Sequence, residues 1–118
     1  MIHRAVSDLA AGNWVIPDPG TGNPIPTSKT GIVAFSSAAA ETNTLGAPSG
    51  AGLILGLFMK TFAVGSRVIT ASAGINQADQ TTMTFGADED FILLMSVPGL
   101  TNGTYLWRVV ANDGVALS

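Results

Sequence analysis

Residues 90–97 have the sequence DFILLMSV, residues 98–103 PGLTNG, and residues 104–111 TYLWRVVA. Two runs of β-forming residues therefore flank a loop of Pro, Gly and Asn, a pattern that predicts a β-hairpin. The first run is apolar on both of its alternating faces, with Phe91, Leu93, Met95 and Val97 on one and Ile92 and Leu94 on the other. A strand with one face in water would alternate, so we expect both faces of this strand to be covered. Either a second sheet or another subunit would cover the second face.

The chain is short enough for one domain, and it carries few charges. Charged residues make up 11% of its 118 residues, against about 25% in a typical soluble domain. One interpretation is a Thr-rich β domain whose exposed surface consists of Ser, Thr, Asn and Gly. We favour a second, in which much of the surface is buried against copies of the chain or a larger scaffold, because free monomers usually depend on charge to stay soluble.

The distribution of charge and the absence of cysteine exclude several functions. The net charge is −3, and the five basic residues are scattered along the chain: Arg4, Lys29, Lys60, Arg67 and Arg108. No basic stripe could follow a phosphate backbone, so we expect no nucleic-acid partner. Without cysteine, the chain has no disulfide, no thiolate nucleophile and no Cys-based metal site.

The chain also lacks apolar segments of the kind that direct a protein to a membrane. Its first four residues, MIHR, lead to Asp8 and turn residues instead of an apolar stretch, so we expect no signal peptide. The apolar run from Leu53 to Met59 is far shorter than the ~20 residues that a membrane helix needs. We therefore expect no membrane partner and a protein made in the cytoplasm.

Residues 1–31 differ in composition from the rest. Four of the six prolines lie there, mixed with glycines, and proline excludes both a helix and a central strand. Apolar residues such as Trp14, Val15, Ile16 and Ile25 are costly to leave in water. We therefore predict an extended N-terminal arm over residues 1–31, laid across another surface, and a β domain over residues 32–118. In the alternative, residues 12–16 form an edge strand and the rest a long loop on the arm's own domain.

The β domain is predicted from short runs of β-forming residues separated by turns. We expect strands at residues 29–37, 53–62, 67–71, 81–85 and 115–117, besides the two of the hairpin. Residues 38–41 could make one helical turn, residues 42–52 a strand end and loop, and residues 112–114 (NDG) a tight turn. Strands at this spacing predict an all-β fold: a single antiparallel β-sandwich or barrel, jelly-roll-like or β-tulip-like.

No group of residues in the sequence has the composition of an active site. His3 is the only histidine, so neither a catalytic triad nor a zinc site of the usual kind can be assembled. The acidic residues 88–90 match no Ca²⁺ loop and indicate a solvated turn. Gly50-Ala51-Gly52 lacks the ending of a phosphate loop. We therefore predict no catalytic, cofactor or metal residues, and no enzyme.

Two residues of the second hairpin strand have alternative interpretations. Trp107 is predicted to lie in the core, although an exposed Trp107 or Tyr105 could form a platform for a ligand. Arg108 lies on the opposite face of an otherwise apolar strand, either at a sheet edge or in a contact between subunits. Asp90 and Asp113 are its possible partners.

The second half of the chain resembles small head proteins of tailed bacteriophages. The resemblance covers residues 52–118: LIL at 53–55, VITA at 68–71, INQ at 75–77, TMTF at 82–85, a Gly/Asp turn, FILL at 91–94, LWRVVA at 106–111 and NDGV at 112–115. Residues 1–51 take no part in it.

The resemblance implies a function as a capsid decoration, or cement, protein. Such proteins are small, β-rich and frequently homotrimeric, and they bind the major capsid protein where capsomers meet on the outside of the virion. The arm would lie along that protein, and the expected capsid or subunit contacts are Trp14, Val15, Ile16, Ile25 and Arg108. The alternative is a carbohydrate- or receptor-binding β module of a virion fibre or knob.

Overall fold

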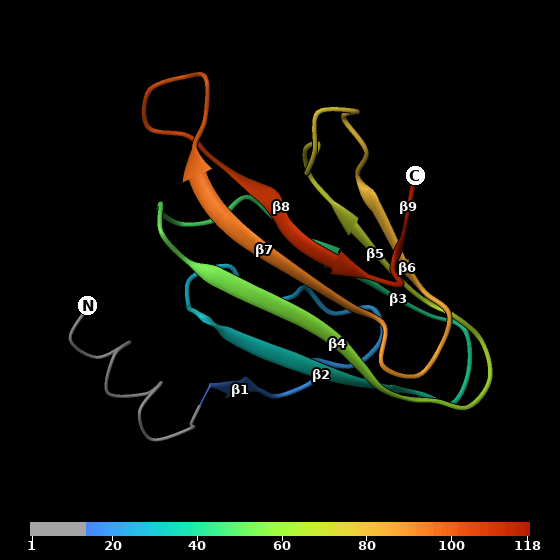
Figure 1. Cartoon of the computed structure of the whole chain (residues 1–118). Coiled ribbons are helices and arrows are strands. Elements are labelled where there is room, and N and C mark those ends of the chain that lie inside the picture. Colours follow the sequence, from blue (N-terminus) through green and yellow to red (C-terminus); the bar gives the residue numbers. More distant parts are fainter. Residues whose placement is uncertain (1–13) are drawn as a thin grey trace.

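Alternating inward and outward side chains build two β-sheets. The computed structural model describes residues 14–118, and this range contains strands and no helix. Sheet A has the order β1-β2-β4-β7-β8, and sheet B has the order β3-β5-β6-β9 (Figure 1). The strands are β1 (Val15–Ile16), β2 (Gly31–Ser37), β3 (Glu41–Leu45), β4 (Ile54–Phe62), β5 (Arg67–Ala71), β6 (Thr82–Phe85), β7 (Phe91–Pro98), β8 (Tyr105–Asp113) and β9 (Ala116–Leu117). The all-β prediction is confirmed.

The predicted hairpin is the β7–β8 pair. Its strands are antiparallel, with Val97 opposite Leu106 and a bulge between Leu93 and Leu94. The Gly99 amide donates to the Thr104 carbonyl at 2.8 Å and closes the loop. On the other side of β7, β4 pairs with it antiparallel. β7 is therefore a central strand, as its apolar sequence indicated.

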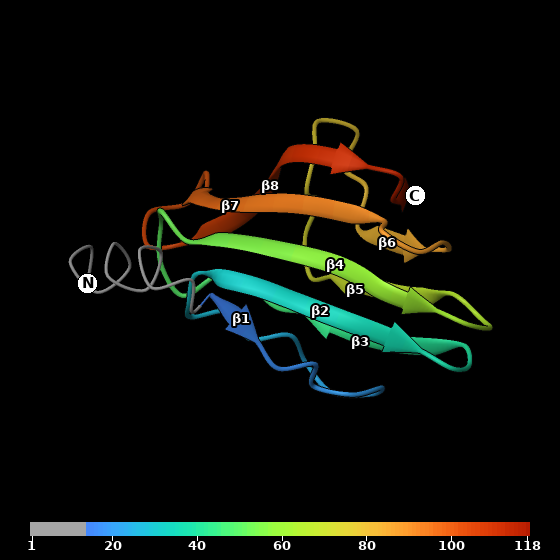
Figure 2. The same cartoon turned by 60° about the horizontal axis from the view of Figure 1, so that its bottom comes forward.

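The prediction of a purely antiparallel fold is wrong. β1 with β2, β2 with β4, and β3 with β5 are parallel pairs, so both sheets are mixed. The chain passes from β2 in sheet A to β3 in sheet B, returns to β4, and crosses again to β5. A strand that returns to its sheet through the other sheet can run parallel to its neighbour. The short turns at 38–40 and 63–66 therefore join different sheets, as the two layers in Figure 2 show.

Two local predictions also need correction. The expected helical turn at 38–41 and loop from 42 are replaced by a bend and by β3. The alternation of β3 was hidden because one of its inward positions is Asn43, a polar residue. The sequence NDG at 112–114 makes no hairpin, because β8 continues to Asp113 and Gly114 (φ +92°) leads the chain to β9 in the other sheet.

The two sheets share one hydrophobic core. Its fully buried members come from both sheets, including Phe35, Leu55, Leu57, Met59, Ile69, Met83, Phe85, Ile92 and Leu94. The rings of Phe35 and Phe85 meet edge to face across the sheets, with their centroids 5.7 Å apart. In β7 the inward face consists of Ile92, Leu94 and Ser96. Its other apolar face points away from sheet B and is only partly covered.

The described part of the predicted arm lies on its own β domain. We call residues 14–27 the strap. Val15 and Ile16 pair with β2 at the edge of sheet A, and Pro24 pairs with Thr44 at the edge of sheet B. Ile16 and Ile25 are buried in the core. Residues 15–16 therefore form an edge strand, as the alternative prediction for this segment proposed. Residues 1–13, which include His3, lie outside the described residues.

Arg67 joins the strap to both sheets. Its side chain is fully buried, and its guanidinium donates to Asp18 at 2.7 Å and 3.3 Å and to the Asn43 side chain. The guanidinium carbon also lies 4.6 Å from the centre of the Phe35 ring. Asn43 in turn donates to the carbonyls of two strap residues. A buried cation needs such a set of acceptors, because an unpaired buried charge is strongly destabilising.

This hydrogen-bond network lowers the pKa of Asp18. Its partial burial alone would raise its pKa, but hydrogen bonds from Arg67 and from the amides of Gly20 and Ser36, with the charge of Arg67, outweigh burial. The pKa of Asp18 therefore lies below its ordinary value. The folded protein thus holds the carboxylate form.

A pair of substitutions in β7 should separate its two faces. Leu94→Asp should prevent folding, because it puts an unpaired carboxylate into the core, at a cost of several kcal/mol. Leu93→Asp, one residue away on the outward face, should retain the native circular dichroism spectrum. Equal destabilisation of both variants in urea unfolding would contradict the assigned orientation of β7.

Removing the buried cation should loosen the strap. Arg67→Met leaves Asp18 and Asn43 without their shared donor and should lower the free energy of unfolding by about 3 kcal/mol. Arg67→Lys should recover only part of this loss, because an ammonium cannot serve the same acceptors as the planar guanidinium. A urea midpoint of Arg67→Met equal to that of the wild type would show that the network does not stabilise the fold.

The same network predicts a dependence of stability on pH. Because the pKa of Asp18 is lower in the folded state, the unfolded state binds more protons than the folded state at pH values between the two pKa values. The contribution of Asp18 is complete above about pH 4, the ordinary pKa of aspartate, and it is lost as the pH falls through the folded-state pKa. The stability gap between wild type and Asp18→Asn should therefore narrow in acid. A gap that stays constant down to pH 2 would contradict this assignment.

Candidate interaction surface

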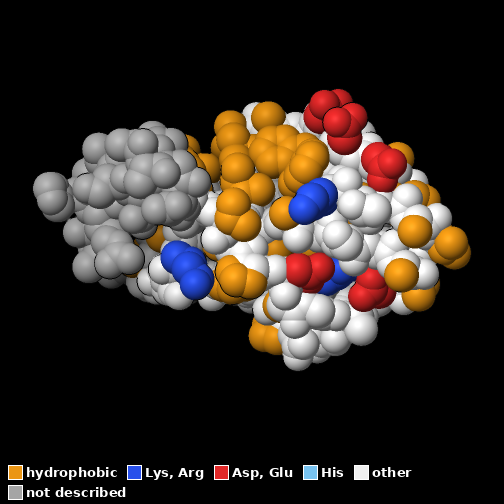
Figure 3. Space-filling view, turned by 90° about the horizontal axis from the view of Figure 1, so that it is seen from below, with side chains coloured by type: hydrophobic (Ala, Val, Ile, Leu, Met, Phe, Trp, Pro, Cys, Tyr) orange, Lys and Arg blue, Asp and Glu red, His pale blue; other side chains and the backbone are white. Residues whose placement is uncertain are grey.

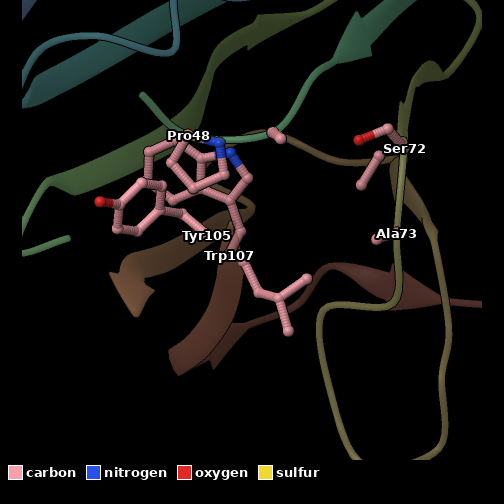
Figure 4. Close-up of a pocket in the computed structure, with 8 residues that line it drawn as sticks. Pro48, Ser72, Ala73, Tyr105 and Trp107 are labelled. Atoms are coloured by element: carbon pink, nitrogen blue, oxygen red, sulfur yellow. The ribbon is translucent and has the colours of Figure 1, made fainter. Parts of the chain in front are cut away.

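The described residues offer little that could bind a small ligand. Between residues 14 and 118, no group of three or more His, Asp or Glu side chains is placed to hold a metal ion. A hollow between the loop after β3, the end of β5 and the start of β8 has room for only about one water molecule. Figure 4 shows Pro48, Tyr105 and Trp107 on one side of it and Ser72 and Ala73 on the other.

Trp107 is part of the core, as predicted. Its side chain is 3% exposed, and its indole N–H donates to the Gly46 carbonyl at 3.0 Å. A stacking platform for a sugar or base would need an exposed aromatic face, which Trp107 does not present. Tyr105, the other candidate, is half-buried at the hollow.

Two of the acidic residues 88–90, Asp88 and Asp90, accept hydrogen bonds from backbone amides. One oxygen of Asp90 accepts hydrogen bonds from the amides of Gly86 and Ala87, and a carboxylate oxygen of Asp88 accepts one from Phe62. Asp90 is only 9% exposed, so this turn is partly buried. The prediction of a solvated turn therefore needs correction. Because Asp90 serves this turn, it is not the partner of Arg108.

The outward face of sheet B is polar, as expected for a solvated face. Its side chains are mostly threonines: Thr42, Thr44, Val68, Thr70, Thr82, Thr84 and Ala116. Thr44 and Thr70 are exposed and lie opposite each other on neighbouring strands. This face therefore shows which residues the chain places in water.

The outward face of sheet A is apolar, in contrast. We call it the outer face, and its apolar members are Val15, Ile32, Ala34, Ile54, Phe58, Phe91, Leu93, Met95, Val97 and Leu106. Val15 is 72% exposed, and Ile32 and Met95 are each more than one-third exposed. No protein layer among the described residues covers this face.

The outer face is continuous across its strands because of Gly56. A side chain at this position would come within 3.1 Å of both Ile32 and Phe91, which close over the glycine from either side. Phe91 also meets Phe58 edge to face, with ring centroids 6.2 Å apart. Side chains from β2, β4 and β7 therefore form one apolar surface. In the view from below, hydrophobic side chains gather in a patch with charged side chains at its margin (Figure 3).

The structure divides the predicted contact residues into two groups. Val15 and Arg108 lie on the outer face, at its opposite edges on β1 and β8. Arg108 lies opposite Met95 and forms no ion pair with another described residue. Ile16 and Ile25 are buried in their own domain and present no surface to a partner, and Trp14 is half-buried just before β1.

The described chain has no helix that is long and apolar enough to cross a membrane.

Comparison with known proteins adds no relative to this description. Neither a protein-family model, nor a curated protein, nor a solved structure matches the chain. The asymmetry between the polar face of sheet B and the apolar outer face of sheet A is therefore the feature from which function is inferred.

Proposed function

We propose that the chain is a structural protein without enzymatic activity: a capsid decoration protein that binds the outside of a bacteriophage head, stabilises the shell and acts as a homotrimer. The apolar outer face is the observation that carries this proposal, because contiguous exposed apolar patches mark contacts with other macromolecules. The major capsid protein is the proposed partner, and the virion surface the proposed location. The motif resemblance of residues 52–118 points to the same class of protein.

The low charge of the chain supports an assembled state. Only 11% of its residues are charged, and a water-exposed apolar sheet in so uncharged a protein would promote association. The small hollow beside Trp107 leaves no room for an organic substrate. A structural role in which the apolar outer face is buried within an assembly fits these features.

We also propose which type of β-sandwich the chain forms. Two sheets around a shared core support a sandwich. The parallel pairs argue against a jelly roll, which is built from antiparallel strands. The β-tulip-like alternative is therefore the one we propose.

The alternative function, carbohydrate or receptor binding, has less support. It relied on an exposed Trp107 or Tyr105, and the indole of Trp107 is buried and hydrogen-bonded. Tryptophan fluorescence should therefore remain unchanged when polysaccharides are added.

Capsid binding can be tested with undecorated heads assembled from the cognate major capsid protein. The full chain should co-sediment with these heads at a fixed number of copies per capsomer, and the decorated heads should withstand higher temperature, because a ligand of the folded shell stabilises it. Imaging of the particles should show the protein at capsomer junctions. Failure to co-sediment would overturn the proposed function.

A further inference from the structure

We propose that the outer face of sheet A is the binding surface for a second copy of this chain. The inference rests on the proposed function in one respect, that an assembly of copies is the working form. It goes further by naming the surface through which the copies meet and the residues that contribute to it.

The size of the outer face fits a contact between proteins. Four long strands about 4.8 Å apart, each about seven residues long at about 3.3 Å per residue, give a footprint of roughly 440 Å². This is comparable to the ~400 Å² that an isolated domain should leave exposed as one apolar patch. It is a little over half of the ~800 Å² that each partner contributes to a standard interface. The face can therefore supply about half of one side of such a contact.

The form of the outer face suits another sheet. Gly56 has no side chain, and Ile32 and Phe91 close the space above it, so the middle of the face has no deep groove for a single inserted side chain. Sheet faces of this kind pack on other sheet faces about 10 Å apart, as the two sheets within this chain do around their core. An apolar sheet face of this kind can therefore pack against a second copy of the chain.

The charges of β8 favour a second copy over an unrelated partner. Arg108 lies on the outer face opposite Met95, and Ala111 lies on the same face opposite Leu93. Strand alternation then places Asp113, which is exposed, on this face as well. The face carries one cation and one carboxylate along one edge, so a copy of the chain can supply Asp113 to Arg108.

The contact can be tested by comparing two acidic substitutions at equivalent strand positions. Leu93→Asp puts a carboxylate in the middle of the outer face, and Thr70→Asp puts one on the polar face of sheet B. Both variants should fold, as judged by circular dichroism. In analytical ultracentrifugation, wild type and Thr70→Asp should form the same oligomer. The dissociation constant of Leu93→Asp should rise about a hundredfold or more, because an apolar contact is lost and a carboxylate is buried.

A charge exchange tests the pairing along β8. Arg108→Asp and Asp113→Arg should each weaken self-association, and the double variant should recover it if the two residues pair between copies. The recovery is diagnostic, because a merely structural role of either residue would not be restored by the exchange. A double variant weaker than both single variants would overturn the pairing.

The outcomes separate this inference from the proposed function. Two results would overturn the inference even if the protein binds heads. One is a folded Leu93→Asp variant that associates as tightly as the wild type. The other is a wild type that stays monomeric at about 50 μM, a concentration far above the dissociation constant of a stable contact. Self-association that is lost in Leu93→Asp while the wild type binds no heads would support the inference and overturn capsid decoration. Loss of association in Leu93→Asp, with head binding by the wild type, would support both.

Discussion

The buried guanidinium of Arg67 is the interaction on which the arrangement of the strap and the sheet edges depends. It lies at the start of β5 and reaches Asp18 in the strap, Asn43 in β3 and the ring of Phe35 in β2. A cation without exposure to water requires acceptors from the protein. Each of these acceptors belongs to a different segment, so satisfying one charge fixes the relative positions of three segments.

This constraint decides which surfaces remain for a partner. With the strap in place, the edges of β2 and β3 pair with the chain's own backbone at Val15–Ile16 and Pro24. Edge strands that are covered in this way do not recruit strands from other chains. On this side of the molecule, among the described residues, only the two-residue β1 and an isolated bridge at Pro24 form the sheet edges, and such short edges limit strand addition. The outer face of sheet A is the larger surface open to contact.

The sequence predicted the elements well and their connections poorly. The strands of the hairpin, β4 and β5 follow from runs of β-forming residues, because such runs depend on local side-chain pattern. The parallel pairs depend on which sheet each strand joins, which residue spacing does not encode. Arg67 and Asn43 were missed for a related reason: their burial follows from partners 24 to 49 residues away in the chain.

The sequence indicated only part of the outer face. The two-sided apolar pattern of β7 indicated that a second face of this strand loses water, but not that Val15, Ile32 and Phe58 join it from other strands. Their alignment required the register of sheet A. Once the register is known, the threonines of sheet B serve as an internal reference, because both faces belong to one chain of one composition. The contrast between threonine on one outward face and Ile, Leu, Met and Phe on the other therefore supports the proposal that this chain is one layer of a larger assembly.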